Sequence, residues 1–385
     1  DRLAGMDPDL VVTGTAVDLP DGGSSVALDR TSPDDPAIIG YTSGTTGRPK
    51  GAILTQANLL AGARSVQVAW RWTEADRLLL CLPLFHMHGL GVGLHGTLLA
   101  GGSAVLQPGF DPDAVLEGLA QHRCSMFFGV PTMYHRLVGH EGATALGDLR
   151  LCVSGSAPLS PALHRRLREW AGVSVLERYG MTETNMNTSN PYDGERRAGT
   201  VGFPLPGVEL KITDAETGAT LPEGEAGIIE VRGPNVFQGY WQMPEKTRAE
   251  LRDDGFFITG DIGVIDPDGY VQIVGRAKDL IISGGYNIYP KEVELVLDDQ
   301  PAVLESAVIG VPHPDFGEGV VGVLVAEPGT TPDLAAIQAA VGEKLAKFKH
   351  PKRLEVVSEL PRNTMGKVQK NMLRDRFAEV FKGKG

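Results

Sequence analysis

Residues 41–51, with the sequence YTSGTTGRPKG, lie between two short apolar stretches, 37–39 and 52–54, that we expect to form β-strands. Three glycines let the backbone of this segment adopt conformations closed to other residues, so its N–H groups can converge on an anion. Three threonines and a serine add hydroxyl donors, and a lysine adds a positive charge. The segment therefore predicts a loop that binds phosphate, and its expected ligands are Thr42, Ser43, Gly44, Thr45, Thr46, Gly47 and Lys50.

The spacing of this loop differs from that of the common P-loop. Gly44 and Gly47 are three residues apart, and Lys50 is followed by Gly51, where the P-loop requires Ser or Thr. A polar hairpin turn is the simplest alternative. Eleven consecutive residues rich in phosphate-binding types, set between two apolar strands, argue against that alternative.

Length and composition limit the class of protein. A chain of 385 residues predicts two or three domains, and 42% hydrophobic with 22% charged residues is ordinary for a soluble protein. The net charge of −12 argues against a general nucleic-acid-binding protein. Cys81, Cys124 and Cys152 lie in apolar contexts without metal-binding spacing, which is typical of buried thiols in a cytoplasmic protein. No apolar run reaches the length of a membrane span, so we expect neither nucleic acid nor membrane as a partner.

Up to residue 199, predicted strands alternate with predicted helices. Strands are expected at 78–84, 103–106, 125–130, 149–153 and 173–177, and helices at 56–68, 89–99, 112–122, 132–138 and 161–170. Thr55, Asp111 and Ser160 are placed to cap three of these helices, two of which then begin with proline. The alternation predicts an α/β fold with a mostly parallel sheet and ligands at the carboxyl ends of its strands.

After residue 199 the pattern changes. β-rich segments at 208–214, 227–233 and 270–274 predict a small antiparallel β subdomain at about 200–274, and a charged connector follows at 275–283. The last third predicts an α+β unit with helices at 290–300 and 332–347 and strands at 307–311, 320–326 and 354–357. We therefore expect an N-terminal domain over 1–276 and a C-terminal domain over 279–385, with a hinge near Lys278.

A second motif, RYGMTET at 178–184, follows a predicted strand at the sheet edge where ligands bind. An aromatic ring can stack on a purine, and a carboxylate can bind Mg²⁺, which prefers hard oxygen ligands beside phosphate. Together with the loop at 41–51, this motif resembles the signatures of the adenylate-forming superfamily of acyl-CoA synthetases, luciferases and peptide-synthetase adenylation domains. In that superfamily the loop holds the β- and γ-phosphates of ATP while a carboxylate attacks the α-phosphate.

The resemblance implies roles around the nucleotide. Tyr179 would pack on adenine, Thr182 would contact phosphate, and Glu183 would bind Mg²⁺ together with Thr45. Asp261, in the turn TGD, would bind the ribose diol. The other implied nucleotide-binding residues are Gly180, Met181, Arg276 and the strand-end loop Ser154, Gly155, Ser156 and Ala157, which also walls the acyl pocket. A plain strand-to-helix turn is the alternative for that loop.

Further motifs lie in the last third. PRNTMGK at 361–367 resembles the catalytic-lysine motif, and Lys367 would stabilise the two anions that meet in the transition state. GRAKD at 275–279 resembles the hinge about which a mobile C-terminal domain rotates, with Lys278 at the pivot; a solvated charge run is the alternative. After rotation, the implied coenzyme A contacts are Gly284, Gly285, Tyr286 and Lys349.

The acid that is activated has to be inferred from the expected acyl pocket. His86, as a catalytic residue, and Met87, His88 and Met186 should face this pocket, because they follow strand-end motifs. Two bulky methionines favour a small acid. The segment 181–202 resembles malonyl-CoA synthetases, in which an arginine at this place binds the second carboxylate. The candidates for that arginine are Arg196 and Arg197, with Arg150 as a further one.

The sequence thus predicts an ATP- and Mg²⁺-dependent acid–CoA ligase, with malonate as the expected acid and no carrier protein as a partner. Malonyl-adenylate and pyrophosphate would form first, and the thiol of coenzyme A would then displace AMP. A CoA ligase for another small or aryl acid is one alternative. An inactive nucleotide-binding fragment is the other, because family members carry an α/β segment before the phosphate loop that we expect to be absent here.

Overall fold

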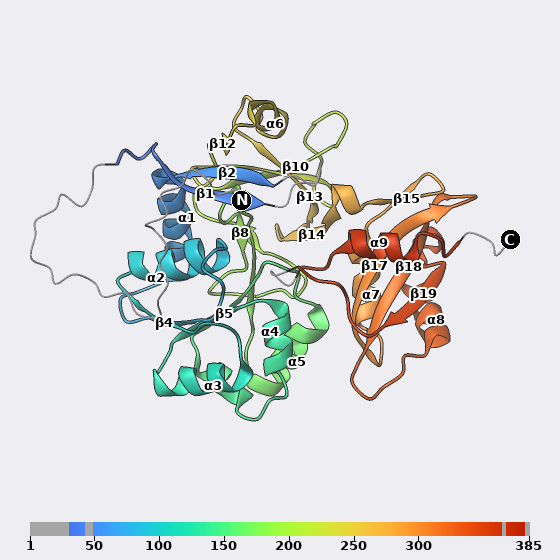
Figure 1. The fold of residues 1–385 in the computed structure, drawn as a ribbon, viewed down its shortest axis with the longest axis horizontal. Coiled ribbons are helices and arrows are strands. Elements are labelled where there is room, and N and C mark those ends of the chain that lie inside the picture. Colours follow the sequence, from blue (N-terminus) through green and yellow to red (C-terminus); the bar gives the residue numbers. More distant parts are fainter. Residues whose placement is uncertain (1–30, 43–48, 364–366, 382–385) are drawn as a thin grey trace, which may run out of the picture. The chain divides into compact units, whose positions relative to one another are not determined.

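The computed structural model describes residues 31–42, 49–363 and 367–381. All the elements below belong to one compact unit, Pro33–Gly385. In the described residues four β-sheets organise this unit (Figure 1). The predicted α/β fold is confirmed. None of the described helices combines the length with the apolar character that a membrane span requires.

The largest sheet has seven strands in the order β4-β3-β5-β6-β7-β8-β9, and the pairings from β4 to β7 are parallel. The strands are β3 (Arg77–Leu80), β4 (Ser103–Leu106), β5 (Met126–Gly129), β6 (Leu151–Ser154), β7 (Leu176–Tyr179), β8 (Thr188–Ser189) and β9 (Phe203–Pro204). The helices are α1 (Gln56–Ala69), α2 (His95–Leu99), α3 (Pro112–Gln121), α4 (Pro131–Leu137) and α5 (Pro161–Ala171). Because side chains alternate along a strand, one sheet face packs on α1 and the other on α3, α4 and α5.

The helix starts follow the predicted caps. The Thr55 hydroxyl accepts from the backbone N–H of Asn58, whose side chain accepts from the N–H of Thr55, so α1 begins with a capping box. Asp111 and Ser160 accept from backbone N–H groups at the starts of α3 and α5, and each is followed by proline. These local signals fix where the helices leave the strand ends, and hence the edge of the sheet that is open to ligands.

A three-stranded antiparallel sheet frames the phosphate loop. Its order is β1 (Pro36–Thr42), β2 (Lys50–Thr55) and β12 (Gly239–Tyr240). Thr42 pairs with Lys50, so the two ends of the loop lie side by side. The predicted strands at 37–39 and 52–54 therefore exist and are longer than predicted, since the pairing continues to the ends of the loop.

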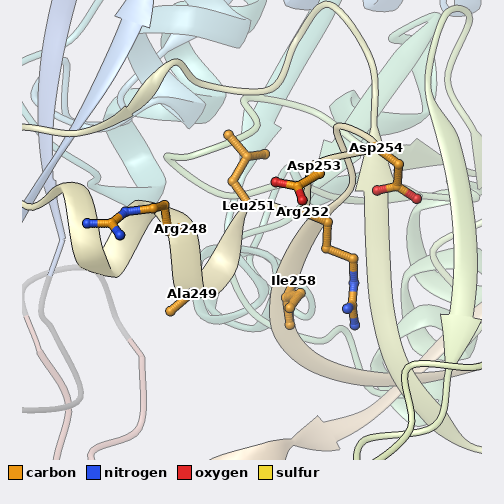
Figure 2. A pocket seen from close by; sticks show the side chains of 7 residues that line it. All are labelled: Arg248, Ala249, Leu251, Arg252, Asp253, Asp254 and Ile258. Carbon is orange, nitrogen blue, oxygen red and sulfur yellow. The ribbon is translucent and has the colours of Figure 1, made fainter.

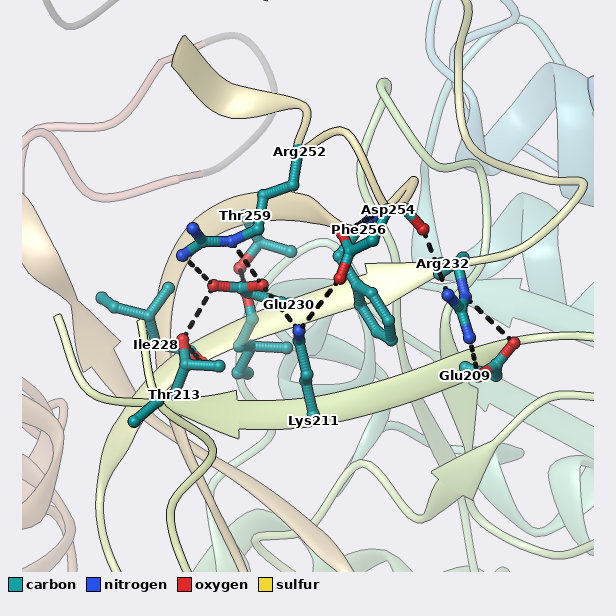
Figure 3. A network of polar contacts seen from close by, with 12 residues as sticks. Glu209, Lys211, Thr213, Ile228, Glu230, Arg232, Arg252, Asp254, Phe256 and Thr259 are labelled. Carbon is teal, nitrogen blue, oxygen red and sulfur yellow. Dashed lines mark hydrogen bonds and ion pairs between the residues drawn. The ribbon is translucent and has the colours of Figure 1, made fainter. Parts of the chain in front are cut away.

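The antiparallel β subdomain contains β10 (Glu209–Thr213), β11 (Gly227–Arg232), β13 (Phe257–Ile265) and β14 (Val271–Arg276), paired in that order, with α6 (Pro244–Glu250) beside it. The buried Glu230 carboxylate accepts from Arg252 at 2.5 and 2.8 Å and from the hydroxyl of Thr213 (Figure 3). We did not predict β13, because Gly260 at φ +72° and a register shift after Ile262 break its alternation.

The last third forms a five-stranded sheet. Its strands are β15 (Ile281–Ser283), β16 (Tyr286–Ile288), β17 (Val303–His313), β18 (Gly317–Ala326) and β19 (Arg353–Val357). Its helices are α7 (Pro290–Asp298), α8 (Leu334–Lys344) and α9 (Lys370–Phe377). The two faces of the β17–β18 hairpin each build a separate apolar cluster, which explains why this segment reads as an independent core. The predicted helix at 332–347 is shorter at both ends, because Asp333 is its N-cap and the backbone is extended at Leu345.

Candidate active site

The candidate site lies at the carboxyl ends of β6 and β7, where parallel sheets bind ligands. Ser154 pairs with Glu177 in the register of these strands, so the loops that follow them leave the same edge of the sheet. The side chain of Ser156, at φ +68°, lies with its Oγ 3.2 Å from Nδ1 of His88. The two sequence motifs at 86–89 and 154–157 therefore meet in the structure.

Arg178 occupies the centre of this edge. Arg178 is only 5% exposed. Its Nε and Nη2 atoms are buried without a hydrogen-bond partner among the described residues. Burial lowers the pKa of the Arg178 guanidinium to about 9. Since a buried charge without a partner is costly, this side chain can receive an anion, which the described part of the chain does not supply.

Two histidines lie beside this guanidinium. Burial, Lys367 and Arg178 lower the pKa of His86 to about 4, and burial together with Arg178 and His86 lowers that of His88 well below its ordinary value. The backbone N–H of His88 donates to Nδ1 of His86 at 3.2 Å. Both imidazoles are therefore neutral at pH 7, and each can serve as a hydrogen-bond donor or acceptor without adding charge.

A second cluster connects β7 to the antiparallel subdomain. The hydroxyl of Tyr179 donates to Asp261 Oδ2 at 2.6 Å, and Arg276 Nε lies 3.0 Å from Asp261 Oδ1. Asp261 thus lies next to the residue predicted to pack on adenine, as a ribose ligand should. Thr182 lies against β1, because a Cβ atom at Gly40 would overlap its methyl group. Gly180 and Met181, in the same turn, are partly exposed.

Glu183 is the carboxylate predicted to bind Mg²⁺. It is 3% exposed, and its Oε1 accepts from the hydroxyls of Tyr240 at 3.0 Å and Thr42 at 3.4 Å. In the described chain it forms no ion pair, and no group of three metal-ligating side chains surrounds it. One buried carboxylate without a cation suits Mg²⁺, which commonly takes one or two protein carboxylates and completes its shell with water and phosphate.

The phosphate loop is only partly within the described residues. Ser43, Gly44, Thr45, Thr46 and Gly47 lie outside them. Lys50 donates to the hydroxyl of Tyr240 at 3.0 Å and lies 3.4 Å from Glu250. Two of the predicted phosphate ligands, Thr42 and Lys50, are thus connected through Tyr240 and Glu183.

Lys367 is electrostatically linked to the same site. Its pKa is lowered by burial and by the positive charges of Arg276 and Arg178, while Asp261 and Glu183 oppose this effect. Its backbone N–H donates to the side chain of Asn363 at 3.0 Å. The predicted catalytic lysine therefore lies within electrostatic range of both the nucleotide cluster and the buried guanidinium, although it is 184 residues away from Glu183 in the chain.

The three arginines predicted to bind the distal carboxylate lie elsewhere. Arg150 precedes β6, at the amino end of the sheet, and makes two bonds of 2.5 and 2.6 Å to the buried Asp76. Arg196 donates to the carbonyl of Ser174, before β7 begins. Arg197 pairs with Asp266 at 2.8 Å.

Because the amino and carboxyl ends of the strands are opposite edges of the sheet, the structure does not bring Arg150 or Arg196 together with His86 and Ser156. Arg197 faces the turn after β13. Each of the three already has partners within the protein. The predicted Met87 and Met186, by contrast, are buried in the core beside the site, where Met186 lies against Gly180.

The residues predicted to bind coenzyme A form their own group. Gly284 and Gly285, at φ +59° and +82°, make the two-residue turn between β15 and β16, a geometry that favours glycine at both positions. The exposed Tyr286 ring stacks on Phe348 at 4.6 Å, and Lys349 donates to Glu292 at 2.5 Å. The predicted hinge residue Lys278 is exposed in the short helical turn after β14.

A surface hollow of about 410 Å³ lies apart from this site, between α6 and β13 (Figure 2). Its lining residues are Arg248, Ala249, Leu251, Arg252, Asp253, Asp254 and Ile258. The guanidinium of Arg252 is already bonded to Glu230 (Figure 3), so this side chain is not a free cation in the hollow.

Known proteins resemble the chain closely. Residues 7–241 match the family described as AMP-binding enzyme, and residues 292–367 match the AMP-binding enzyme C-terminal domain. A sulfoacetate–CoA ligase of Cupriavidus necator is 40% identical over 381 residues, which cover 96% of this chain and 74% of the relative. A malonate–CoA ligase of Arabidopsis thaliana is 39% identical over 372 residues, covering 89% and 60%. The crystal structure of ATP-bound MatB from Rhodopseudomonas palustris has a TM-score of 0.88 at 55% identity, covering 91% of this chain and 70% of that one.

The chain therefore belongs to the AMP-binding enzyme family. Within that family it is an acid–CoA ligase, a class that uses ATP, coenzyme A and a carboxylic acid. It spans between 60% and 74% of the length of the two curated relatives above. Those relatives act on different acids, so the choice of acid rests on the site itself.

Sequence reasoning gave no role to two residues of this site, Arg178 and Tyr240. Arg178 is the first residue of the motif RYGMTET and lies in the buried strand β7. A charged residue in a buried strand is unusual, and this was the feature of the sequence that could have indicated a functional role. Tyr240 lies 57 residues from Glu183, and tertiary contacts bring them together, among them the pairing of β12 with β2 and the hydrogen bond from the Phe237 N–H to the Glu183 carbonyl.

Proposed function

We propose that this chain activates a small acid that carries a second anionic group, with malonate as the best candidate, and transfers it to coenzyme A. The observation that supports this proposal is the buried Arg178 guanidinium, which has no hydrogen-bond partner on Nε or Nη2 in the described part of the chain and lies beside His88 and Ser156. An acid with one carboxylate would leave this charge unsatisfied once that carboxylate reacted. A second carboxylate would satisfy it through a fork of donors.

The adenylation step would use the cluster at the carboxyl ends of β6 and β7. Asp261 would hold the ribose and Tyr179 the adenine, while Glu183 would bind Mg²⁺, which would neutralise phosphate charge when bound. The remaining described nucleotide ligands would be Thr42, Lys50, Gly180, Met181, Thr182 and Arg276, with Ser154, Gly155, Ser156 and Ala157 as the wall between nucleotide and acid. Lys367 would stabilise the carboxylate and α-phosphate as they approach each other.

The second step would replace AMP by the thiol of coenzyme A. The sulfur–carbon bond forms as the acyl–phosphate bond breaks, and the thiol proton leaves to a base or to water. We propose that the C-terminal segment rotates about a hinge near Lys278 for this step. The rotation would present Gly284, Gly285, Tyr286 and Lys349 to coenzyme A. His86 and His88, neutral at pH 7, would line the acyl group without competing with its negative charge.

The relative named for sulfoacetate points to a close alternative. Sulfoacetate, like malonate, presents a second anionic group next to the reacting carboxylate, and a guanidinium binds sulfonate as well as carboxylate oxygens. Met87 and Met186 are bulky and buried beside the site, which favours a short acid over long-chain and aryl acids. The charge of Arg178 therefore supports the substrate class more strongly than the particular acid.

Pyrophosphate release measured across a panel of acids tests the proposal. The panel contains malonate, methylmalonate, sulfoacetate, oxalate, acetate, ferulate and indoleacetate, each with ATP and Mg²⁺. We expect malonate or sulfoacetate to give a kcat/KM at least roughly tenfold above that of acetate, the factor corresponding to 1.4 kcal/mol of transition-state binding. Highest activity with ferulate or indoleacetate would overturn the proposed substrate class.

A further inference from the structure

Tyr240 of β12 lies between the predicted Mg²⁺ ligand and an ion cluster on α6. We propose that Tyr240 is a positioning residue that holds the Glu183 carboxylate ready for Mg²⁺, with Glu250 and Lys50 fixing its hydroxyl. This inference rests on the proposed adenylation function, because it assigns Mg²⁺ to Glu183. It adds a residue to which neither the sequence motifs nor the comparisons gave a role.

The hydroxyl of Tyr240 has three close neighbours. It lies 3.0 Å from Glu183 Oε1 and 2.7 Å from Glu250 Oε2, and the ammonium group of Lys50 donates to it at 3.0 Å. A phenol can donate one proton and accept at its oxygen, so Lys50 satisfies the acceptor side while a carboxylate takes the proton. The position of the hydroxyl is therefore fixed from three directions.

The two carboxylates differ in their charge partners. Glu250 lies 2.6 Å from Lys246 and 3.4 Å from Lys50, so two ammonium groups neutralise it. Glu183 receives only hydroxyl donors from the described part of the chain, Tyr240 and Thr42. A buried carboxylate held by neutral donors keeps its full negative charge available for a cation, whereas Glu250 does not.

The Tyr240 ring is held as firmly as its hydroxyl. It packs edge-on against the ring of Phe237, with 4.8 Å between the ring centroids, and the Lys50 ammonium lies 4.3 Å from the Tyr240 centroid. The backbone of Tyr240 pairs with Ala52 of β2. A rigidly held phenol suits the positioning of a metal-binding carboxylate.

The alternative is that Tyr240 only stabilises the fold. A purely structural role predicts that loss of the hydroxyl lowers the melting temperature and leaves metal binding unchanged. A positioning role predicts a specific loss of metal affinity, and such outer-shell groups typically contribute about 10- to 100-fold.

The test is Tyr240→Phe, which keeps the ring and removes the hydroxyl. The matched control is Tyr270→Phe, since the Tyr270 hydroxyl is also held within the protein, donating to the carbonyl of Glu195 at 2.8 Å. Binding of Mn²⁺ in the presence of ATP, followed by electron paramagnetic resonance, reports metal affinity without turnover. The Mg²⁺ concentration that gives half-maximal pyrophosphate release is the second readout.

We expect Tyr240→Phe to weaken Mn²⁺ binding and to raise the Mg²⁺ requirement by about tenfold, with Tyr270→Phe unchanged in both. Unchanged Mn²⁺ affinity in Tyr240→Phe overturns the inference. If Tyr240→Phe fails to fold, Tyr240→His serves instead, since its shorter ring has no hydroxyl to hold Glu183, and an unchanged Mn²⁺ affinity again overturns the inference. A parent enzyme that binds Mn²⁺ with ATP but adenylates no acid refutes the proposed function alone, since the Mn²⁺ comparison remains valid.

Discussion

The backbone of Gly155 lies directly against the guanidinium of Arg178: a Cβ atom on residue 155 would be 2.5 Å from Arg178 Nε. No side chain fits at this position unless the guanidinium moves. The strand-end loop therefore holds the buried Arg178 guanidinium in place, in addition to its proposed role as a wall of the nucleotide site. Glycine is required here by close approach and not by backbone conformation.

Gly155→Ala should displace that guanidinium. We expect kcat/KM for malonate to fall by roughly 10- to 100-fold, the scale of a displacement of about 1 Å at a reacting site. The matched control is Gly109→Ala, where no atom lies within 4 Å of the added methyl group. Steady-state pyrophosphate release measures both variants, and a Gly155→Ala enzyme as active as the control would show that the guanidinium position is unimportant.

Lys367→Ala should separate the two half-reactions. Adenylation should slow by roughly 100-fold, the scale of removing one preorganised charge, while thioester formation from synthetic malonyl-adenylate and coenzyme A should change little. Single-turnover assays of each step check this. Equal losses in both steps would refute the proposed rotation near Lys278.

The same lysine predicts a pH dependence. Burial and neighbouring positive charges lower the pKa of Lys367, so it loses its proton at a lower pH than an ordinary lysine. Because the protonated form stabilises the transition state, adenylation should decline as the pH rises through this lowered pKa. Thioester formation should not share this decline.

Glu177 predicts a pH-dependent stability. Burial raises its pKa to about 8 in the folded chain, against about 4.5 ordinarily. Between these values the folded state binds more protons than the unfolded state, so this residue stabilises the fold below pH 4.5 and the contribution is lost as the pH rises to about 8. The free energy of unfolding of Glu177→Gln should increase relative to that of the parent as the pH rises, by about 1 kcal/mol or more at pH 8.5. Melting curves between pH 5 and 8.5 test this, with the exposed Glu169→Gln as a flat control.

Arg150 should prove structural. Arg150→Met leaves the buried Asp76 carboxylate without its cation, so we expect a loss of about 3 kcal/mol in unfolding free energy with unchanged preference for malonate over acetate. Arg353→Met, which breaks an exposed pair, should cost less than about 1 kcal/mol. Restoration of stability by the double variant Asp76→Asn and Arg150→Met would support this reading, and an altered acid preference would contradict it.

Local signals made much of the fold predictable. Thr55, Asp111 and Ser160 cap helices as expected, because a cap depends on residues three positions apart. The loop at 41–51 and the motif at 178–184 could be recognised because each is contiguous in the chain. Strand β13 was missed because Gly260 and a register shift obscure its period.

Long-range pairing was not predictable in the same way. Arg150 meets Asp76 across 74 residues and Arg197 meets Asp266 across 69, and nothing local in the sequence indicates either pair. These partners decide which arginines are satisfied within the protein. Only the structure therefore distinguishes the paired Arg150 and Arg197 from Arg178, whose Nε and Nη2 lack a hydrogen-bond partner among the described residues.

The central claim is that Arg178 selects an acid with a second anionic group, and Arg178→Met tests it most directly. The measurement is kcat/KM for malonate and for acetate in the parent, in Arg178→Met and in Arg197→Met as the matched control. The account predicts that Arg178→Met loses about 2–4 kcal/mol of transition-state stabilisation with malonate and little or none with acetate. Arg197→Met should keep the parent's kcat/KM with both acids. Equal use of malonate by Arg178→Met and the parent, or a loss with malonate in Arg197→Met alone, would contradict it.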